Sequence, residues 1–200
     1  MSFTTCLYAQ LLEHGGDYAS GRQAHLEATR LAREAGYPAP IHRAASALGW
    51  NALLTEDYDA AREALAEILG RISPRALHER MGVGTNLAWA ELFLANYDDA
   101  GERLLEALRL ARDFRHKRIA AETLIGLAAT RAAAGSHEAP IGALWGAGRT
   151  LLHDCGEQAT TIEKRAENRW LVPHEQEYRP AYELGTVLSF EEAIDLALPS

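Results

Sequence analysis

The side chains that could do chemistry in this sequence do not form a known catalytic or metal-binding pattern. The run His153-Asp154-Cys155 contains three residue types that bind metals, but three adjacent residues of a helix point in different directions. None of the eight histidines belongs to an HExxH sequence or another paired metal-binding spacing. No recognisable nucleophile–base arrangement or carboxylate pair is present. We therefore expect no catalytic residue, no metal site and no cofactor.

One stretch of the chain recurs at a nearly constant spacing. Tyr58 and Tyr97 occupy the same place in two related copies, 57–61 and 96–100, which lie thirty-nine residues apart. Another copy stands thirty-nine residues further on at 135–139, and a weaker one stands at 16–21. Four copies at a near-constant period indicate one supersecondary unit stacked on itself.

Each copy lies at the expected turn of a pair of helices. Small residues follow the turn at the same place in each second helix, where two helices can pack closely; they are Gly21, Ala61, Ala100 and Ala139. Asp17 is a candidate N-cap, and Ser73 with Pro74 predicts the start of the third unit. The expected repeats span about 1–37, 41–73, 74–115 and 117–155, and together they form a domain over 1–155.

The period is lost after residue 156. We expect a charged helix over 157–170 and a further helix, opened by Pro173, that Pro180 breaks or kinks. Ser189 and Glu192 form a capping box that starts a last helix at 190–198. Residues 156–200 are therefore predicted to be capping helices that cover the apolar side of the last repeat.

The helix–turn–helix units resemble tetratricopeptide repeats. The Leu-Gly pair of that motif's first helix stands here as Leu48-Gly49, and it changes to Leu87-Ala88 and to Gly126-Leu127 in the next units. The period of thirty-nine is longer than the usual thirty-four or so. The resemblance implies an all-α fold, a right-handed α-solenoid of tetratricopeptide-like helix hairpins with a C-terminal helical cap.

The resemblance also suggests a binding surface, because first helices line the concave face of such stacks. Trp50 and Trp89 occupy the same place in successive first helices, so both are expected to face the groove. Equivalent positions give a ligand- or partner-binding face of Arg43, Ser46, Trp50, Leu53, Thr85, Trp89, Leu92 and Arg131. Aromatic area would supply affinity for an extended peptide or an amphipathic helix, and charges would fix its direction. The alternative is that both indoles pack between adjacent repeats.

The C-terminal half resembles a more specific group. Residues 139–156, with Leu144-Trp145-Gly146, and the closing stretch 184–198 are similar in order and spacing to the C-terminal sensor region of large bacterial LuxR-type and related ATP-dependent (STAND-class) transcriptional regulators. The chain contains neither a GxxxxGK[ST] phosphate loop nor a recognisable DNA-reading helix-turn-helix. The resemblance therefore implies only the repeat-and-cap sensor portion, as a fragment or a stand-alone relative.

Composition limits the kinds of partner. A formal net charge of −8 argues against direct nucleic-acid binding, which needs a basic face. No stretch is apolar and long enough to predict a membrane span, and no secretory signal is recognisable at the start, so we expect a cytoplasmic protein. Cys6 and Cys155 are expected to be reduced thiols.

Three functions remain open from sequence. The leading hypothesis is a non-enzymatic repeat domain that binds a peptide, a protein segment or a small effector within a bacterial transcription-regulatory or signalling protein. The second is a scaffold that forms homo- or hetero-oligomers through an exposed edge without a ligand. The third is an enzyme housed in the helical array.

Overall fold

The computed structural model describes residues 2–36, 38–136 and 140–198, and all regular secondary structure within them is helical. Successive helices pack against one another as hairpins, which confirms the predicted all-α fold built as a solenoid of helix hairpins. Contacts divide the chain into two compact units, Met1–Ala76 and Leu77–Ser200. Each unit is described by itself.

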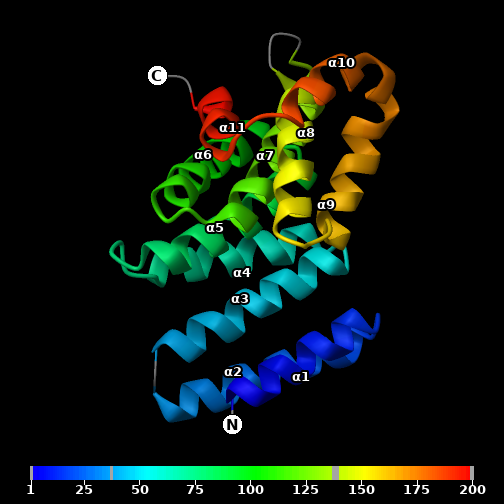
Figure 1. The fold of residues 1–200 in the computed structure, drawn as a ribbon. Helices are drawn as coiled ribbons and strands as arrows, with labels where there is room; N and C mark the ends of the chain where they lie inside the picture. The colour runs from blue at the N-terminus through cyan, green and yellow to red at the C-terminus, as the bar shows by residue number, and fades with distance from the viewer. Residues whose placement is uncertain (1, 37, 137–139, 199–200) are drawn as a thin grey trace. The chain divides into compact units, whose positions relative to one another are not determined.

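The first unit contains two helix hairpins (Figure 1). Its helices are α1 (Ser2–His14), α2 (Tyr18–Ala35), α3 (Pro38–Leu54) and α4 (Tyr58–Arg71). Each helix packs on the next, and α1 also contacts α3. The two hairpins coincide with the first two predicted repeats, about 1–37 and 41–73, except that α3 begins at Pro38.

The turns of the hairpins share one backbone conformation. Gly16, Glu56, Ala95 and Gly135 all have positive φ angles, between 63° and 83°, and they are spaced by forty, thirty-nine and forty residues. Asp17 and Asp57 follow two of these residues, and their carboxylates accept backbone N–H groups of the helix that begins there. The predicted N-cap at Asp17 is therefore confirmed, and the repeat is visible in the backbone as well as in the sequence.

The second unit contains the third and fourth hairpins. The third hairpin consists of α5 (Leu77–Phe93) and α6 (Tyr97–Asp113), and the fourth consists of α7 (Lys117–Ala133) and α8 (Ile141–Asp154). The predicted helix start at Ser73 and Pro74 is wrong. The Ser73 carbonyl accepts the N–H of Ala76 at 2.9 Å, so these residues close a turn before α5 begins.

Small residues mark close contacts inside the hairpins, as predicted. Ala61 and Ala100 are fully buried, whereas Ala139 lies outside the described residues. Gly49 faces Leu65 so closely that a Cβ at this glycine would lie 2.5 Å from the leucine Cγ. A larger residue at position 49 would therefore separate α3 from α4.

The C-terminal segment packs on the hairpins of the second unit. It comprises α9 (Thr161–Ala166), a π-helical turn (Glu167–Leu171), a 3₁₀ turn (Val172–His174), α10 (Glu175–Gly185) and α11 (Phe190–Ala197). Helix α9 contacts α7, α10 lies along α8, and α11 contacts α6, α7 and α8. The predicted capping box of Ser189 and Glu192 is confirmed. Helix α10 continues through Pro180 without a break, and because proline has no N–H the carbonyl four residues earlier lacks its helical donor.

Candidate functional site

Helices α8 and α10 approach each other unusually closely because glycines replace side chains at their contact. A Cβ on Gly146 would lie 2.2 Å from the carbonyl oxygen of Tyr182, and one on Gly142 would lie 2.4 Å from that of Tyr178. On the opposite helix, Gly185 is as close to the backbone of Ala143. Nothing larger than glycine fits at these positions, so the glycines fix the position of α10 on α8.

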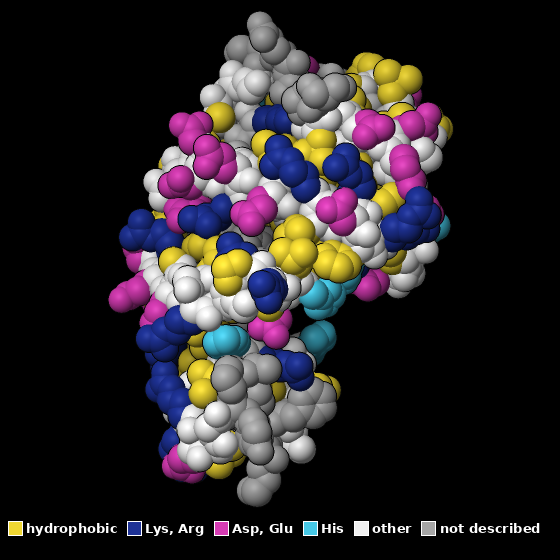
Figure 2. All heavy atoms as spheres, turned by 90° about the vertical axis from the view of Figure 1, so that its left-hand side faces the viewer, with side chains coloured by type: hydrophobic (Ala, Val, Ile, Leu, Met, Phe, Trp, Pro, Cys, Tyr) yellow, Lys and Arg dark blue, Asp and Glu magenta, His cyan; other side chains and the backbone are white. Residues whose placement is uncertain are grey.

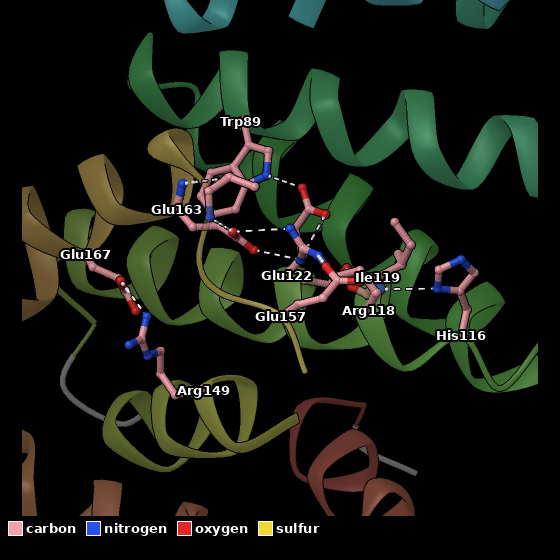
Figure 3. A network of polar contacts seen from close by, with 11 residues as sticks. Trp89, His116, Arg118, Ile119, Glu122, Arg149, Glu157, Glu163 and Glu167 are labelled. Atoms are coloured by element: carbon pink, nitrogen blue, oxygen red, sulfur yellow. Dashed lines mark hydrogen bonds and ion pairs between the residues drawn. The ribbon is translucent and has the colours of Figure 1, made fainter. Parts of the chain in front are cut away.

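The chain changes its helical geometry between α9 and α10. The turn Glu167–Leu171 is π-helical and the next, Val172–His174, is 3₁₀. Pro173 has no N–H and cannot continue an α-helical hydrogen-bond ladder. Short π-helical turns are frequent at functional sites because they redirect side chains. Here the π-helical turn begins at Glu167, whose carboxylate points towards α8 (Figure 3).

A cavity of about 450 Å³ lies beside this turn, between α8 and α10. Its lining combines two aromatic side chains and one aliphatic side chain with two guanidinium groups and three carboxylates; the residues are Trp145, Arg149, Glu167, Val172, Glu175, Arg179, Tyr182 and Glu183. The rings of Trp145 and Tyr182 meet edge to face, with centroids 5.0 Å apart. This volume is within the range of small-ligand pockets, about 300–1,000 Å³.

Glu167 is the buried charge of the cavity. Trp145 donates its indole N–H to Oε1 at 2.7 Å. Arg149 Nη1 lies 3.5 Å from Oε2 (Figure 3). Burial raises the pKa of Glu167, while the indole hydrogen bond and the Arg149 charge oppose that rise. The pKa of Glu167 therefore depends in part on whether Arg149 stays beside it.

A second polar network joins α5, α7 and the segment that precedes and begins α9. Trp89 donates to Glu122 Oε1 at 2.8 Å, and Arg118 lies 3.5 Å from the other oxygen of Glu122 (Figure 3). Arg118 also pairs with Glu157 at 2.7 Å and with Glu163 at 2.9 Å. Burial, reinforced by the Glu163 charge, raises the pKa of Glu122 to about 7. The network holds α9 on α7.

The first unit has a buried network of its own. His25 Nε2 lies 3.1 Å from Glu13 Oε1, and Asn51 donates to the same oxygen at 2.7 Å. Burial alone would lower the pKa of His25, but hydrogen bonding to Cys6 and Glu13 raises it to about 9. These side chains are nearly inaccessible to solvent and connect α1, α2 and α3, so they stabilise the first unit.

Four of the residues predicted to bind a partner are inside the protein. Leu53, Trp89 and Leu92 have no exposed area, and Thr85 is 1% exposed. The indole of Trp89 is turned to Glu122, and the Thr85 hydroxyl donates to a carbonyl of its own helix. This burial corrects the prediction that the four side chains line an open face. Repeat spacing shows which positions are equivalent, but it does not show which helix covers them. For the three residues of α5, that helix is α7.

The other predicted residues keep some exposure. Arg43 is exposed, and Ser46 and Trp50 are half-buried; their spacing places all three on one face of α3. Arg131 is half-buried on α7 in the second unit, where burial lowers its pKa. Partner binding by these four residues stays a prediction.

Sequence reasoning did not assign the cavity residues to a site. The available signal was the spacing of Gly142 and Gly146, which indicates a close helix contact, with Trp145 and Arg149 one turn apart beside it. The partner carboxylate, Glu167, comes from a segment without repeat periodicity. Nothing in the sequence predicts that its side chain meets Trp145.

Comparison with family models, curated proteins and solved structures gave no match. The resemblance to tetratricopeptide repeats and to bacterial regulators therefore stays a prediction. Within the described ranges no group of three or more His, Cys, Asp or Glu side chains could hold a metal ion. No helix in the part of the chain that the structure describes is both long and apolar enough to cross a membrane.

Proposed function

We propose that this chain is a non-enzymatic helical-repeat module that binds a peptide, a protein segment or a small effector in the cavity between α8 and α10. The proposed setting is a bacterial transcription-regulatory or signalling protein, which is the context that the sequence resemblance suggests. Cys6 and Cys155 are free thiols, which favours a reducing compartment such as the cytoplasm.

The lining of the cavity is the observation that carries this proposal. Tyr182 is half-buried and Trp145 is 8% exposed, so the aromatic surface at the cavity comes mainly from Tyr182. Arg149, Arg179 and Glu183 add charges of both signs around it. Pockets that bind small molecules are usually mostly apolar with a few polar groups, whereas five of the eight side chains that line this cavity are charged. The lining therefore favours a ligand that carries charges of its own. A peptide carries both charge signs and an apolar side chain, so it suits this lining better than an entirely apolar ligand does.

The surface charge supports a protein or peptide partner over a nucleic acid. On the face that Figure 2 shows, acidic side chains stand between the Lys and Arg side chains. A formal net charge of −8 further weakens attraction to phosphates.

One observation favours the alternative of an oligomerisation scaffold. Helix α1 exposes Leu7, Tyr8 and Leu11 at 45%, 58% and 71%, and Leu7 and Leu11 lie one turn apart on the same face. Sedimentation of the purified chain tests this alternative. A concentration-dependent dimer that Leu11→Glu converts to a monomer would support the scaffold.

Affinity selection tests the binding proposal directly. The purified chain is incubated with a synthetic mixture of random hexapeptides, and bound peptides are identified by mass spectrometry. We expect selective enrichment that Arg179→Glu and Val172→Arg reduce, because both side chains are exposed at the cavity. Arg109→Glu on α6 is the matched control, since Arg109 is exposed and does not line the cavity. Equal enrichment by all variants would contradict the proposed site.

A further inference from the structure

The pair of Arg149 and Glu167 joins a buried carboxylate to a guanidinium that solvent reaches. The Glu167 side chain is 8% exposed and that of Arg149 is 41% exposed. Their N···O separation of 3.5 Å is long for a charge-assisted hydrogen bond, which typically measures about 2.7–2.9 Å. Trp145 holds the other oxygen at 2.7 Å. Arg149 is therefore the contact of Glu167 that a ligand can displace.

Arg149 has unused capacity to bind an anion. A guanidinium carries five N–H donors, and Glu167 is the one partner found for Arg149 among the described residues. A carboxylate can accept two parallel N–H bonds from a guanidinium, which is stronger than a single long contact. An incoming carboxylate can therefore compete with Glu167 for Arg149.

The charges of the cavity indicate which anion fits. Three carboxylates and two guanidinium groups line it, so one negative charge is in excess when all are ionised. This excess repels a dianion such as phosphate more strongly than a monocarboxylate. The Glu183 carboxylate has no partner within the described residues, so it can accept a hydrogen bond from an ammonium or amide N–H of the ligand. Trp145 and Tyr182 are placed to contact an apolar side chain.

We infer that the cavity binds the free carboxylate of an amino acid or of a peptide C-terminus through Arg149, and that Glu167 takes up one proton from solvent as Arg149 leaves it. This inference rests on the proposed function, because it names the ligand chemistry and the regulation of the same cavity. The proton adds to the Glu167 carboxylate, and no other bond is made or broken.

The surroundings of Glu167 explain the proton uptake. Burial already raises the pKa of Glu167, and loss of the Arg149 charge removes an effect that opposes this rise. The charged groups that remain near it are Glu163 and Lys164 from α9, and Glu175, Arg179 and Glu183 from the α10 side of the cavity. Arg118 pairs with Glu163 at 2.9 Å and offsets its charge, and the other four groups are two positive and two negative, so burial is the main effect that favours the protonated form of Glu167. Loss of the contact with Arg149 therefore shifts Glu167 further towards its protonated form.

The first experiment compares two forms of one probe. The random hexapeptide mixture is synthesised with free C-terminal carboxylates and again with C-terminal amides, and both are selected on the wild-type chain. We expect enrichment from the acid mixture to fall at least about tenfold with the amide mixture, equivalent to about 1.4 kcal/mol. The twenty free amino acids, tested by ligand-observed NMR, distinguish an amino-acid ligand from a peptide terminus.

The second experiment measures protons. Isothermal titration of a selected acid peptide at pH 7 in buffers of different ionisation enthalpy should show net proton uptake. Arg149→Met should weaken binding by at least about tenfold. Glu167→Gln should abolish the proton uptake that accompanies binding of the acid peptide, because the glutamine cannot titrate. Circular dichroism checks that each variant is folded, and the wild-type proton count remains decisive if one is not.

The possible outcomes distinguish a failure of this inference from a failure of the proposed function. Equal enrichment of acid and amide peptides that still depends on Arg179 would overturn the inference and leave the proposed function standing. Acid-selective binding without proton uptake would overturn the role of Glu167. No enrichment from either mixture, and no amino acid bound, would overturn both the inference and the proposed function.

Discussion

The indole N–H of Trp89 lies 2.8 Å from Oε1 of Glu122, in a place that solvent hardly reaches. Trp145 and Glu167 repeat this arrangement at 2.7 Å. In both pairs an arginine nitrogen lies 3.5 Å from the second carboxylate oxygen. The first pair is enclosed by helices, whereas the second borders a cavity. The same three-residue arrangement thus stabilises the fold in one place and is available to a ligand in the other.

Removing the indole N–H of Trp89 should destabilise the second unit. Trp89→Phe leaves the buried Glu122 carboxylate without its neutral donor, and an unsatisfied buried acceptor typically costs about 1–3 kcal/mol. Urea unfolding followed by circular dichroism measures the change. Trp50→Phe is the matched control. Because Trp50 is only half-buried, this variant should lose less free energy of unfolding. Equal losses for the two variants would contradict the role of the Trp89 hydrogen bond.

Stability should depend on pH through Glu122. Its pKa in the folded protein is about 7, above the ordinary 4.5, so the folded state binds more protons than the unfolded state between these values. The free energy of unfolding should therefore decrease as pH rises from about 4.5 to about 7. Glu122→Gln cannot titrate and should remove a decrease on the order of 1–3 kcal/mol. Urea titrations at pH 5, 6, 7 and 8 measure the free energy of unfolding at each pH. If it decreases with pH as steeply in the variant as in the wild type, Glu122 is not the source of the decrease.

A methyl group at Gly146 should separate α10 from α8. The Gly146→Ala Cβ would lie 2.2 Å from the Tyr182 carbonyl oxygen, an overlap that should cost about 1–3 kcal/mol or more and disrupt the cavity. Gly101→Ala on α6 is the matched control. Nothing lies within 4 Å of a Cβ at Gly101, so helix propensity alone should stabilise it by about 0.5–1 kcal/mol. Thermal unfolding that ranks the two variants in the opposite order would refute the close contact.

Ala95→Gly should stabilise the turn between α5 and α6. Ala95 has a φ of 63°, a left-handed conformation that glycine adopts without steric penalty. We expect a gain of about 0.5–1 kcal/mol in the free energy of unfolding. Ala66→Gly, at an exposed position inside α4, should instead lose about 1 kcal/mol. A loss at both positions would contradict the positive φ at Ala95.

The repeat could be predicted from sequence because its signal is local. Tyr58 and Tyr97 mark turns whose hydrogen bonds form between neighbouring residues, so a copied turn leaves a copied pattern. The start of α5 was missed because Ser73 closes a turn with residues that would otherwise be the first of the helix. Both outcomes follow from short-range hydrogen bonding.

The candidate site could not be predicted because it depends on contacts between distant residues. Trp50 and Trp89 are equivalent in the repeat, yet Trp89 is fully buried while Trp50 keeps some exposure. Equivalence of position does not determine what packs over a side chain. Glu167 meets Trp145 only because a non-repeating segment folds back on α8. A pattern that relies on periodicity contains no information about that segment.

Hydrogen–deuterium exchange of the chain with and without a selected hexapeptide tests most directly whether the cavity is the binding site. We predict slower exchange in α8 at 142–154 and in the segment 167–185, with no change in α1–α4. Protection confined to α1–α4, or exchange unchanged throughout while the peptide is bound, would contradict the assignment of the site to α8 and α10.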